Sequence, residues 1–317
     1  MAVLAIMCLL CAVAIAGYVF HLGKTFDDTS TQLGQDEVFA SAQPAAENGG
    51  GRNILLLGAD SRVSGVDYSG EGQSSRSDTM MVMHIADDSS GAQIMSIPRD
   101  LWVPIEGRGE GKINAAMSHG GLPLATETVR DFIDAPIHHV AIVDFAGFQA
   151  LTDSVGGVEV ESDQAFVSNG HSFSEGTNHL NGEEALSFVR ARKNFSDGDL
   201  QRGRNQQAFL KGLVDKIVSA GTLSNPTKIS GMVRDFSPYM TVDDSLSASK
   251  IAGIAYDMRN VRTGDIEFFS APVGGTDRSV DGQSIVKVDE ETLSEIQKAF
   301  ANDTVGDYAE QADDAHL

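Results

Sequence analysis

The chain has 317 residues, and its 23 Lys and Arg against 45 Asp and Glu give a formal net charge of −22. With 41% hydrophobic residues and 33 Gly, the composition is that of an ordinary globular protein, which excludes global disorder. A surface this acidic repels nucleic acid, so we expect no nucleic-acid partner. Any anion that the protein binds must be held by a local group of cations.

The N-terminal residues 2–23 form an apolar run without formal charge. In a helix these residues would extend over about 33 Å, enough to cross a hydrocarbon core of about 30 Å. We predict that residues 1–23 form an uncleaved transmembrane anchor. Two alternatives are a cleaved signal peptide and a buried core helix. A signal peptide would normally begin with basic residues, which are absent before this run, and a core helix would show a polar face, which is not visible. Both cysteines, Cys8 and Cys11, lie in this run, so the rest of the chain can form no disulfide or thiolate metal site.

Composition divides the remaining chain into three parts. Residues 24–52 are polar, small and Gly-rich, which predicts a flexible linker, and residues 302–317 are predicted to be an acidic disordered tail. Between them, residues 53–301 are expected to form one domain. Strands are predicted at 53–57, 79–85, 92–97, 139–143 and 266–270. Helices are predicted at 123–133, 145–154, 182–188, 199–219, 245–259 and 290–300. Alternating strands and helices favour a layered α/β domain.

Basic residues are concentrated in one short stretch, where five of the 23 lie within residues 190–204. Arg190 and Arg192 share a face only if the chain is extended, so if both bind one ligand the preceding helix must end before Arg190. Guanidinium groups bind phosphate oxygens in a bidentate way. Two or three that converge indicate a polyanion such as a pyrophosphate, whereas a solvated charged face is the alternative.

The helix predicted from residue 199 adds to this cluster. Asp199, Arg202 and Gln206 are spaced at i, i+3 and i+7, which places them on one stripe of the helix. Arg204 falls on the opposite side and is expected at the surface.

Further charged and polar residues stand at the ends of predicted strands or in the loops beside them: Asp60, Arg76, Asp78, Arg99, Lys112 and Asn114. Ligands of α/β sheets bind at the carboxyl ends of strands, where Asp60 is expected. Carboxylates beside phosphate-binding arginines suit a Mg²⁺ ion that bridges a pyrophosphate. Ion pairs among the same residues are the alternative interpretation.

Seven segments in a fixed order carry a family resemblance: LLLGADSR, RSDTMMV, SIPRD, KINAA, DSVGGVEV, HLNGEEALSFVRAR and DLQRGRNQQ. They resemble the LytR-CpsA-Psr family of cell-wall glycopolymer transferases. The match extends from about residue 53 to 213, and its most specific stretches are 76–114 and 180–207.

The resemblance implies a three-layer α/β/α sandwich with a mixed central sheet and an apolar pocket for a polyprenyl tail. It implies a single-pass protein of the cell membrane of a Gram-positive bacterium, with its catalytic domain on the extracytoplasmic side. Such phosphotransferases move a glycopolymer, such as teichoic acid, from a polyprenyl-pyrophosphate carrier to a hydroxyl of peptidoglycan. The expected partners are therefore this lipid-linked glycopolymer, the peptidoglycan acceptor and the bilayer.

The resemblance also assigns roles to the residues named above. Asp60 and Asp78 resemble the metal-associated acids, with Mg²⁺ as the expected ion and Mn²⁺ as an alternative. The residues expected to form the pyrophosphate clamp are Arg76, Arg99, Arg190, Arg192 and Arg202, with Asp199 and Gln206 beside them. Lys112 and Asn114 are expected to bind substrate. The sequence departs from the family at Asn205, where a second Arg is common, and in the long loop between Asp60 and Arg76.

The expected reaction is attack by a sugar hydroxyl on the phosphorus next to the glycopolymer, with polyprenyl phosphate as the leaving group. Asp199 is our choice for the group that takes the hydroxyl proton. A non-catalytic regulator that binds the lipid carrier and a lipid pyrophosphatase are the alternatives. The pyrophosphatase would use the same residues, so the sequence does not separate it from a transferase.

Overall fold

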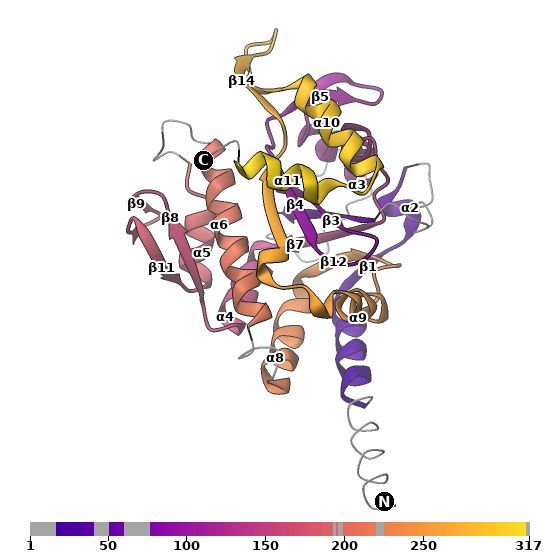
Figure 1. Cartoon of the computed structure of the whole chain (residues 1–317), viewed down its shortest axis with the longest axis vertical. Coiled ribbons are helices and arrows are strands. Elements are labelled where there is room, and N and C mark those ends of the chain that lie inside the picture. Colours follow the sequence, from indigo (N-terminus) through magenta and orange to yellow (C-terminus); the bar gives the residue numbers. More distant parts are fainter. Residues whose placement is uncertain are drawn as a thin grey trace, which may run out of the picture.

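A seven-stranded mixed sheet lies at the centre of the protein in a computed structural model (Figure 1). The structure describes residues 17–40, 51–59, 77–192, 195, 199–219 and 225–314, and of residues 77, 78, 199, 200 and 312–314 it describes the backbone alone. In spatial order the strands are β1 (Thr31–Leu33), β12 (Met240–Asp243), β7 (His139–Asp144), β2 (Arg52–Ala59), β3 (Ser77–Ile85), β4 (Ala92–Ile97) and β13 (Ile266–Ser270).

Parallel and antiparallel pairs both occur in this sheet. Strand β2 pairs parallel with β7 and antiparallel with β3, and β4 pairs antiparallel with β3 and parallel with β13. The expected mixed sheet is therefore confirmed. Strand β2 is apolar on both faces, with Leu55 and Leu57 on one side and Ile54 and Leu56 on the other, because side chains alternate along a strand. A strand with two apolar faces must be covered on both sides.

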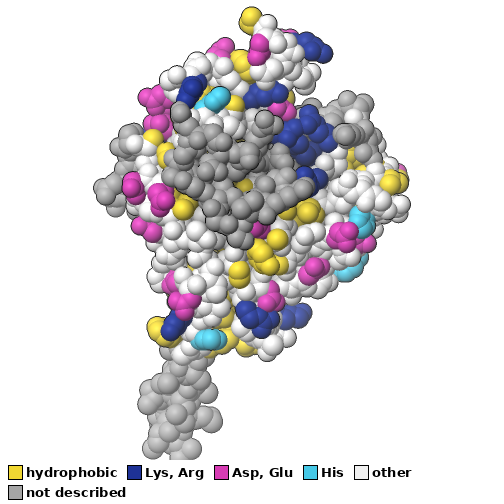
Figure 2. Space-filling view, turned by 180° about the vertical axis from the view of Figure 1, so that it is seen from behind, with side chains coloured by type: hydrophobic (Ala, Val, Ile, Leu, Met, Phe, Trp, Pro, Cys, Tyr) yellow, Lys and Arg dark blue, Asp and Glu magenta, His cyan; other side chains and the backbone are white. Residues whose placement is uncertain are grey.

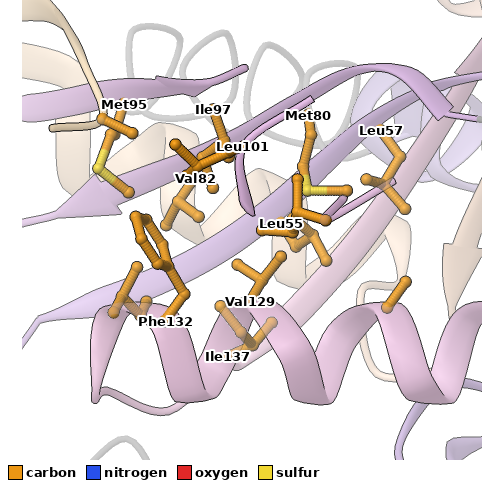
Figure 3. Close-up of a cluster of buried hydrophobic side chains, with 14 of the residues drawn as sticks. Leu55, Leu57, Met80, Val82, Met95, Ile97, Leu101, Val129, Phe132 and Ile137 are labelled. Carbon is orange, nitrogen blue, oxygen red and sulfur yellow. The ribbon is translucent and has the colours of Figure 1, made fainter. Parts of the chain in front are cut away.

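Helices α3 (Ala115–Ile133), α10 (Glu290–Ala301) and α11 (Val305–Asp314) belong to the larger core on one face of the sheet. Figure 3 shows Leu55, Met80 and Val82 of the sheet directed towards Val129 and Phe132 of α3. Helix α3 begins eight residues before the predicted start at residue 123. It has a break at Gly120 and Gly121, where the positive φ of Gly121 (66°) explains why the helical pattern was visible only beyond it.

The opposite face of the sheet packs against the helix described over residues 17–29 and against α9 (Ala248–Asp257). Phe26 of the N-terminal helix is buried with Val242 of β12 and Leu246. No helix in the described part of the chain is long and apolar enough to cross a membrane. Residues 1–16 of the predicted anchor lie outside the described residues.

Two segments predicted to lack structure belong in part to the domain. In the predicted linker, β1 pairs parallel with β12, and Val38 of the one-turn helix α2 (Gln35–Val38) is fully buried. In the predicted tail, Val305 and Ala309 of α11 are buried. These two residues are four apart and lie on one helix face, a short apolar stripe that the acidic composition obscured.

A second core lies beside the sheet and is rich in phenylalanines, which make up four of its twelve buried residues. It is formed by α4 (Phe145–Ser154), α5 (Gly182–Val189), α6 (Asp199–Val218), β8 (Val158–Ser162), β9 (Phe166–Ser168), β10 (His171–Phe173) and β11 (Gly176–Leu180). The rings of Phe166 and Phe188 lie 5.4 Å apart, and those of Phe148 and Phe209 lie 4.5 Å apart. Aromatic contacts of this kind fix the helices relative to one another.

The remaining elements lie around these two cores. They are the hairpins β5 (Trp102–Ile105) with β6 (Gly109–Lys112) and β14 (Val273–Arg278) with β15 (Ser284–Val288), α8 (Pro226–Phe236), and the 3₁₀ turns Ser237–Tyr239, Met258–Asn260 and Thr263–Asp265. The hairpin of β14 and β15 protrudes from the end of the molecule opposite the N-terminal helix (Figure 1).

A buried polar cluster joins β12 to β7. The Asp243 carboxylate accepts a hydrogen bond from the backbone N–H of Val140 at 2.8 Å and another from the Ser245 hydroxyl, and it lies 3.4 Å from Nδ1 of His139. Burial raises the pKa of Asp243, but the hydrogen bonds from His139, Ser245 and Val140 outweigh it and hold this pKa below its usual range. The ionised carboxylate therefore stabilises the fold.

We predict that Asp243→Asn lowers the free energy of unfolding at pH 7 by about 2 kcal/mol, because a buried acceptor loses its charge and part of its hydrogen bonding. Because the pKa of Asp243 is lower in the folded protein than in the unfolded chain, its ionised carboxylate stabilises the fold at pH values above the usual aspartate pKa of about 3.9. This stabilisation is lost as the pH falls through the pKa of the folded protein. Urea unfolding at pH 7 and in acid should therefore show the difference between the two proteins shrinking in acid. A pH-independent difference would contradict this assignment.

Candidate functional site

A cavity of about 720 Å³ lies between the sheet and the phenylalanine-rich core. Most of its wall is apolar and comes from β2, β3, β7, α4, α5, α6 and α8: Leu56, Leu57, Met81, Val143, Phe148, Leu151, Leu186, Phe209, Leu210, Leu213 and Phe236. A cavity of this size is within the usual range of about 300–1,000 Å³ for small-molecule sites.

Four of the arginines predicted from the sequence line this one cavity: Arg99, Arg190, Arg192 and Arg202. Arg99 follows β4, Arg190 and Arg192 follow α5, and Arg202 lies in the first turns of α6. Gln206 lines the cavity one turn after Arg202. Figure 2 shows Lys and Arg side chains gathered directly beside an apolar patch on the face behind that of Figure 1. The apolar patch lies on the side of the cations that faces the N-terminal end of the molecule (Figure 2).

Helix α5 ends before Arg190, as predicted, although the backbone of Arg190 itself is in the αR region and not extended. Its start is fixed by a capping box between Asn181 and Glu184, and its last residue is Val189. Ala191 is buried, whereas Arg190 and Arg192 on either side of it are exposed. The Arg190 guanidinium lies 4.3 Å above the centre of the Phe145 ring, a cation–π contact that orients it.

One face of helix α6 lines the cavity, with Arg202 and Gln206, and another face, with Arg204, does not. Gln206 donates a hydrogen bond of 3.1 Å to the Thr79 hydroxyl of β3, which ties α6 to the sheet. Arg204 is not among the described residues that line the cavity, and it lies 3.7 Å from Asp163 on the outer side. Asn205, where the family often has Arg, is buried and donates a hydrogen bond of 3.2 Å to the Phe188 carbonyl. It therefore holds the end of α5.

Lys112 and Asn114, expected to bind substrate, are not among the described residues that line the cavity. The Lys112 ammonium lies 2.8 Å from Oδ1 of Asp100, and the Asn114 backbone N–H donates to the Arg99 carbonyl at 3.3 Å. Both residues thus contact the turn that carries Arg99.

The predicted acids can be placed only by their neighbours. Asp60 and Arg76 lie outside the described residues, as do the side chains of Asp78 and Asp199. In the backbone, Ala59 of β2 pairs with Ser77 of β3, and a β-bulge falls between that pair and the next, Gly58 with Thr79. Asp78 is the extra residue of the bulge, a feature common next to active sites. Ala59 also pairs with Asp144 on its other side, so all these positions lie at one edge of the sheet.

Asp144 lines the cavity and was missed in the sequence analysis. It ends β7 and caps α4, and its Oδ1 accepts a hydrogen bond of 2.7 Å from the backbone N–H of Gly147. Burial raises the pKa of Asp144, although this hydrogen bond opposes the shift. An Asp directly before a predicted helix that starts at residue 145 was the available signal.

No three His, Cys, Asp or Glu side chains in the described ranges are close enough together to hold a metal ion. This finding does not cover the two acids predicted to bind a metal, because the structure describes neither Asp60 nor the side chain of Asp78. The backbone pairing places the position of Asp78 close to Ala59, and Ala59 pairs with Asp144, whose carboxylate lines the cavity.

A family model for the LytR_cpsA_psr family matches residues 17–302. The chain belongs to this family. Its match to the LytR_cpsA_psr model covers the sheet, the phenylalanine-rich core, the larger core apart from α11 and all the described residues that line the cavity, so the resemblance noted in the sequence is confirmed.

Relatives with similar sequences and solved structures agree with the LytR_cpsA_psr assignment. The chain is 33% identical over 251 residues to the polyisoprenyl-teichoic acid–peptidoglycan teichoic acid transferase TagU of Enterococcus faecalis, covering 79% of this chain and 78% of that protein. The crystal structure of Bacillus subtilis TagV is similar with a TM-score of 0.66 and 28% identity, over 80% of this chain and 96% of TagV. A structure of TagT bound to LI-WTA is similar with a TM-score of 0.63 and 25% identity, over 84% and 98% of the two chains.

Substitutions of Asp144 can separate the effect of its hydrogen bond, which caps α4, from the effect of its partly buried charge. Asp144→Ala removes the cap of α4 and should lower the free energy of unfolding by about 1 kcal/mol. Asp144→Asn keeps the acceptor and removes a partly buried charge, so at pH 7 it should be at least as stable as the parent protein. The raised folded pKa destabilises the fold only when the carboxyl is ionised, so any advantage of Asn should vanish in acid. Equal losses for Ala and Asn in thermal unfolding would contradict the role as a cap.

Proposed function

We propose that this protein is a membrane-anchored phosphotransferase that moves a glycopolymer from a polyprenyl-pyrophosphate carrier to a hydroxyl of peptidoglycan. One observation carries the proposal: four arginines and a long apolar wall share a single cavity. The proposed place of action is the outer face of the cell membrane of a Gram-positive bacterium, with residues 1–23 as the anchor.

The cavity suits an amphiphile with a doubly charged head. Several guanidinium groups in one place repel one another unless an anion lies among them, and a diphosphate offers enough oxygens for bidentate contacts with each. Leu213 and Phe236 belong to the apolar wall of the same cavity. A hydrocarbon tail attached to the diphosphate would be buried along that wall. Each Å² of apolar surface removed from water would stabilise the complex by about 25 cal/mol.

The relatives support the chemical class of the substrates. The name of the Enterococcus faecalis protein states that it transfers teichoic acid from a polyisoprenyl carrier to peptidoglycan. We extend this class of donor and acceptor to the present chain, without choosing the glycopolymer.

Asp60 and Asp78 are the proposed ligands of a Mg²⁺ ion, for which Mn²⁺ could substitute. The ion would neutralise charge on the diphosphate when bound. The chain's own contribution is to bind the diphosphate through Arg76, Arg99, Arg190, Arg192 and Arg202 and to keep water from it with the apolar wall.

The proposed reaction is a substitution at one phosphorus atom. The oxygen of a peptidoglycan hydroxyl forms a bond to the phosphorus that carries the glycopolymer, and the bond from that phosphorus to the bridging oxygen breaks. Polyprenyl phosphate leaves with the electron pair, and the arginines stabilise its added charge. The hydroxyl proton passes to Asp199, the proposed base.

Three single substitutions test the proposal. Arg190→Ala and Arg192→Ala each remove charge-assisted bonds of about 1.5–3 kcal/mol, so transfer should fall about 10- to 100-fold, and Asp78→Ala should abolish it. The measurement is the formation of labelled glycopolymer–peptidoglycan adduct and of polyprenyl phosphate by the full chain.

Arg204→Ala is the matched control, because Arg204 lies in the same helix as Arg202 but outside the cavity, and it should retain full activity. Full activity in all three test variants would refute the site. Polyprenyl phosphate without adduct would identify a lipid pyrophosphatase, and bound lipid without either product would identify a binding protein.

A further inference from the structure

We propose that Asp100 and Lys112 are positioning residues for the transfer: together they hold the guanidinium groups of Arg99 and Arg192 in the cavity without contacting the substrate. This inference rests on the function proposed above. It assigns a role to Asp100, which the sequence did not single out, and changes the role of Lys112.

The geometry around Asp100 places one carboxylate among three cations. Its Oδ2 lies 3.5 Å from Nε of Arg99 and 3.9 Å from Nη2 of Arg192, and its Oδ1 lies 2.8 Å from Nζ of Lys112. Arg99 and Arg192 line the cavity, whereas Asp100 and Lys112 are not among the described residues that do. The Asp100 side chain is only 12% exposed. The carboxylate therefore forms a close ion pair with Lys112 and longer ion-pair contacts with the two arginines.

The backbone around Asp100 fixes this arrangement. Asp100 is part of the turn between β4 and β5, and its carbonyl accepts a hydrogen bond of 2.9 Å from the N–H of Val286 in β15. The segment after Lys112 returns to the same turn: the N–H of Ile113 donates to the Leu101 carbonyl at 2.8 Å, and that of Asn114 to the Arg99 carbonyl. A carboxylate fixed on both sides can orient flexible side chains.

Charge explains why a carboxylate is needed at this place. Like charges a few ångströms apart repel one another, and an unheld arginine side chain has many rotamers that would have to be lost during the reaction. Asp100 offsets the repulsion and orients two of the four arginines before substrate arrives. Preorganised charge of this kind acts mainly on the transition state.

The same geometry predicts how substitutions divide between binding and turnover. The Asp100 carboxylate is negative and repels a diphosphate, so its removal loses orientation but also removes repulsion. KM should then change little while kcat falls. A lysine that touched the diphosphate would behave in the opposite way, because its loss weakens binding and raises KM.

The experiment is a double-mutant cycle on the full chain with Asp100→Asn, Lys112→Met and the double variant, measuring kcat and KM for release of polyprenyl phosphate from a lipid-linked donor. Asp100→Asn should lower kcat about 10- to 100-fold and Lys112→Met about 3- to 10-fold, both with KM within about threefold of the parent value. The double variant should be no worse than Asp100→Asn, because Lys112 acts through Asp100.

Matched controls are available on another hairpin. Lys287 and Asp277 form an ion pair of 2.6 Å on β14 and β15, and both side chains are about half exposed. Lys287→Met and Asp277→Asn should leave kcat and KM unchanged. Melting temperatures of all variants show whether any loss of activity reflects unfolding. Asparagine has nearly the shape of aspartate, so we expect Asp100→Asn to fold.

Two results would overturn the inference in an active protein: losses that multiply in the double variant, or a raised KM with unchanged kcat for Lys112→Met. Failure of the proposed function would look different, because the parent chain would neither release polyprenyl phosphate nor bind farnesyl diphosphate. Binding of that probe can be followed by the fluorescence of Trp102, the single tryptophan, which pairs across β5 and β6 with Lys112.

Discussion

The gathering of several guanidinium groups around one cavity is the constraint on which the site depends. It is unfavourable by itself, and it occurs in a chain with a net charge of −22, where most cations would find a carboxylate nearby. The structure stabilises it with a buried carboxylate beside Arg99 and Arg192 and an aromatic ring under Arg190. These contacts are made by the guanidinium groups themselves, and all three arginines still line the cavity.

The position of the cavity follows from the meeting of two cores. The sheet fixes the ends of β4 and β7, which carry Arg99 and Asp144, and the phenylalanine-rich core fixes α5 and α6, which carry the other arginines of the cavity. The hydrogen bond from Gln206 to Thr79 joins the two parts across the cavity. A cavity between two cores can combine an apolar wall with charged residues, and a lipid diphosphate needs both.

Much of the fold could be predicted from periodicity. The predicted strands at 92–97 and 266–270 and the helix at 145–154 agree with the structure, because their apolar patterns are long and end at clear turn residues. Strand β1 and helix α11 could not be predicted, since β1 is polar and is a strand only through its pairing with β12, and α11 buries few side chains. The shared cavity of the arginines followed from spacing and family resemblance. The contact of Lys112 with Asp100 depends on how the turn after β4 folds, for which the sequence carries no periodic signal.

The most direct test of the central claim is mass spectrometry of the lipid that copurifies with the full chain from membranes, compared with the Arg190→Ala, Arg192→Ala double variant. We expect polyprenyl phosphate or diphosphate, free or with attached sugars, to be bound to the parent protein in near-equimolar amount and to be strongly reduced in the variant. Ordinary phospholipid alone in both proteins, or equal polyprenyl lipid in both, would contradict the claim that the arginines and the apolar wall hold one lipid diphosphate.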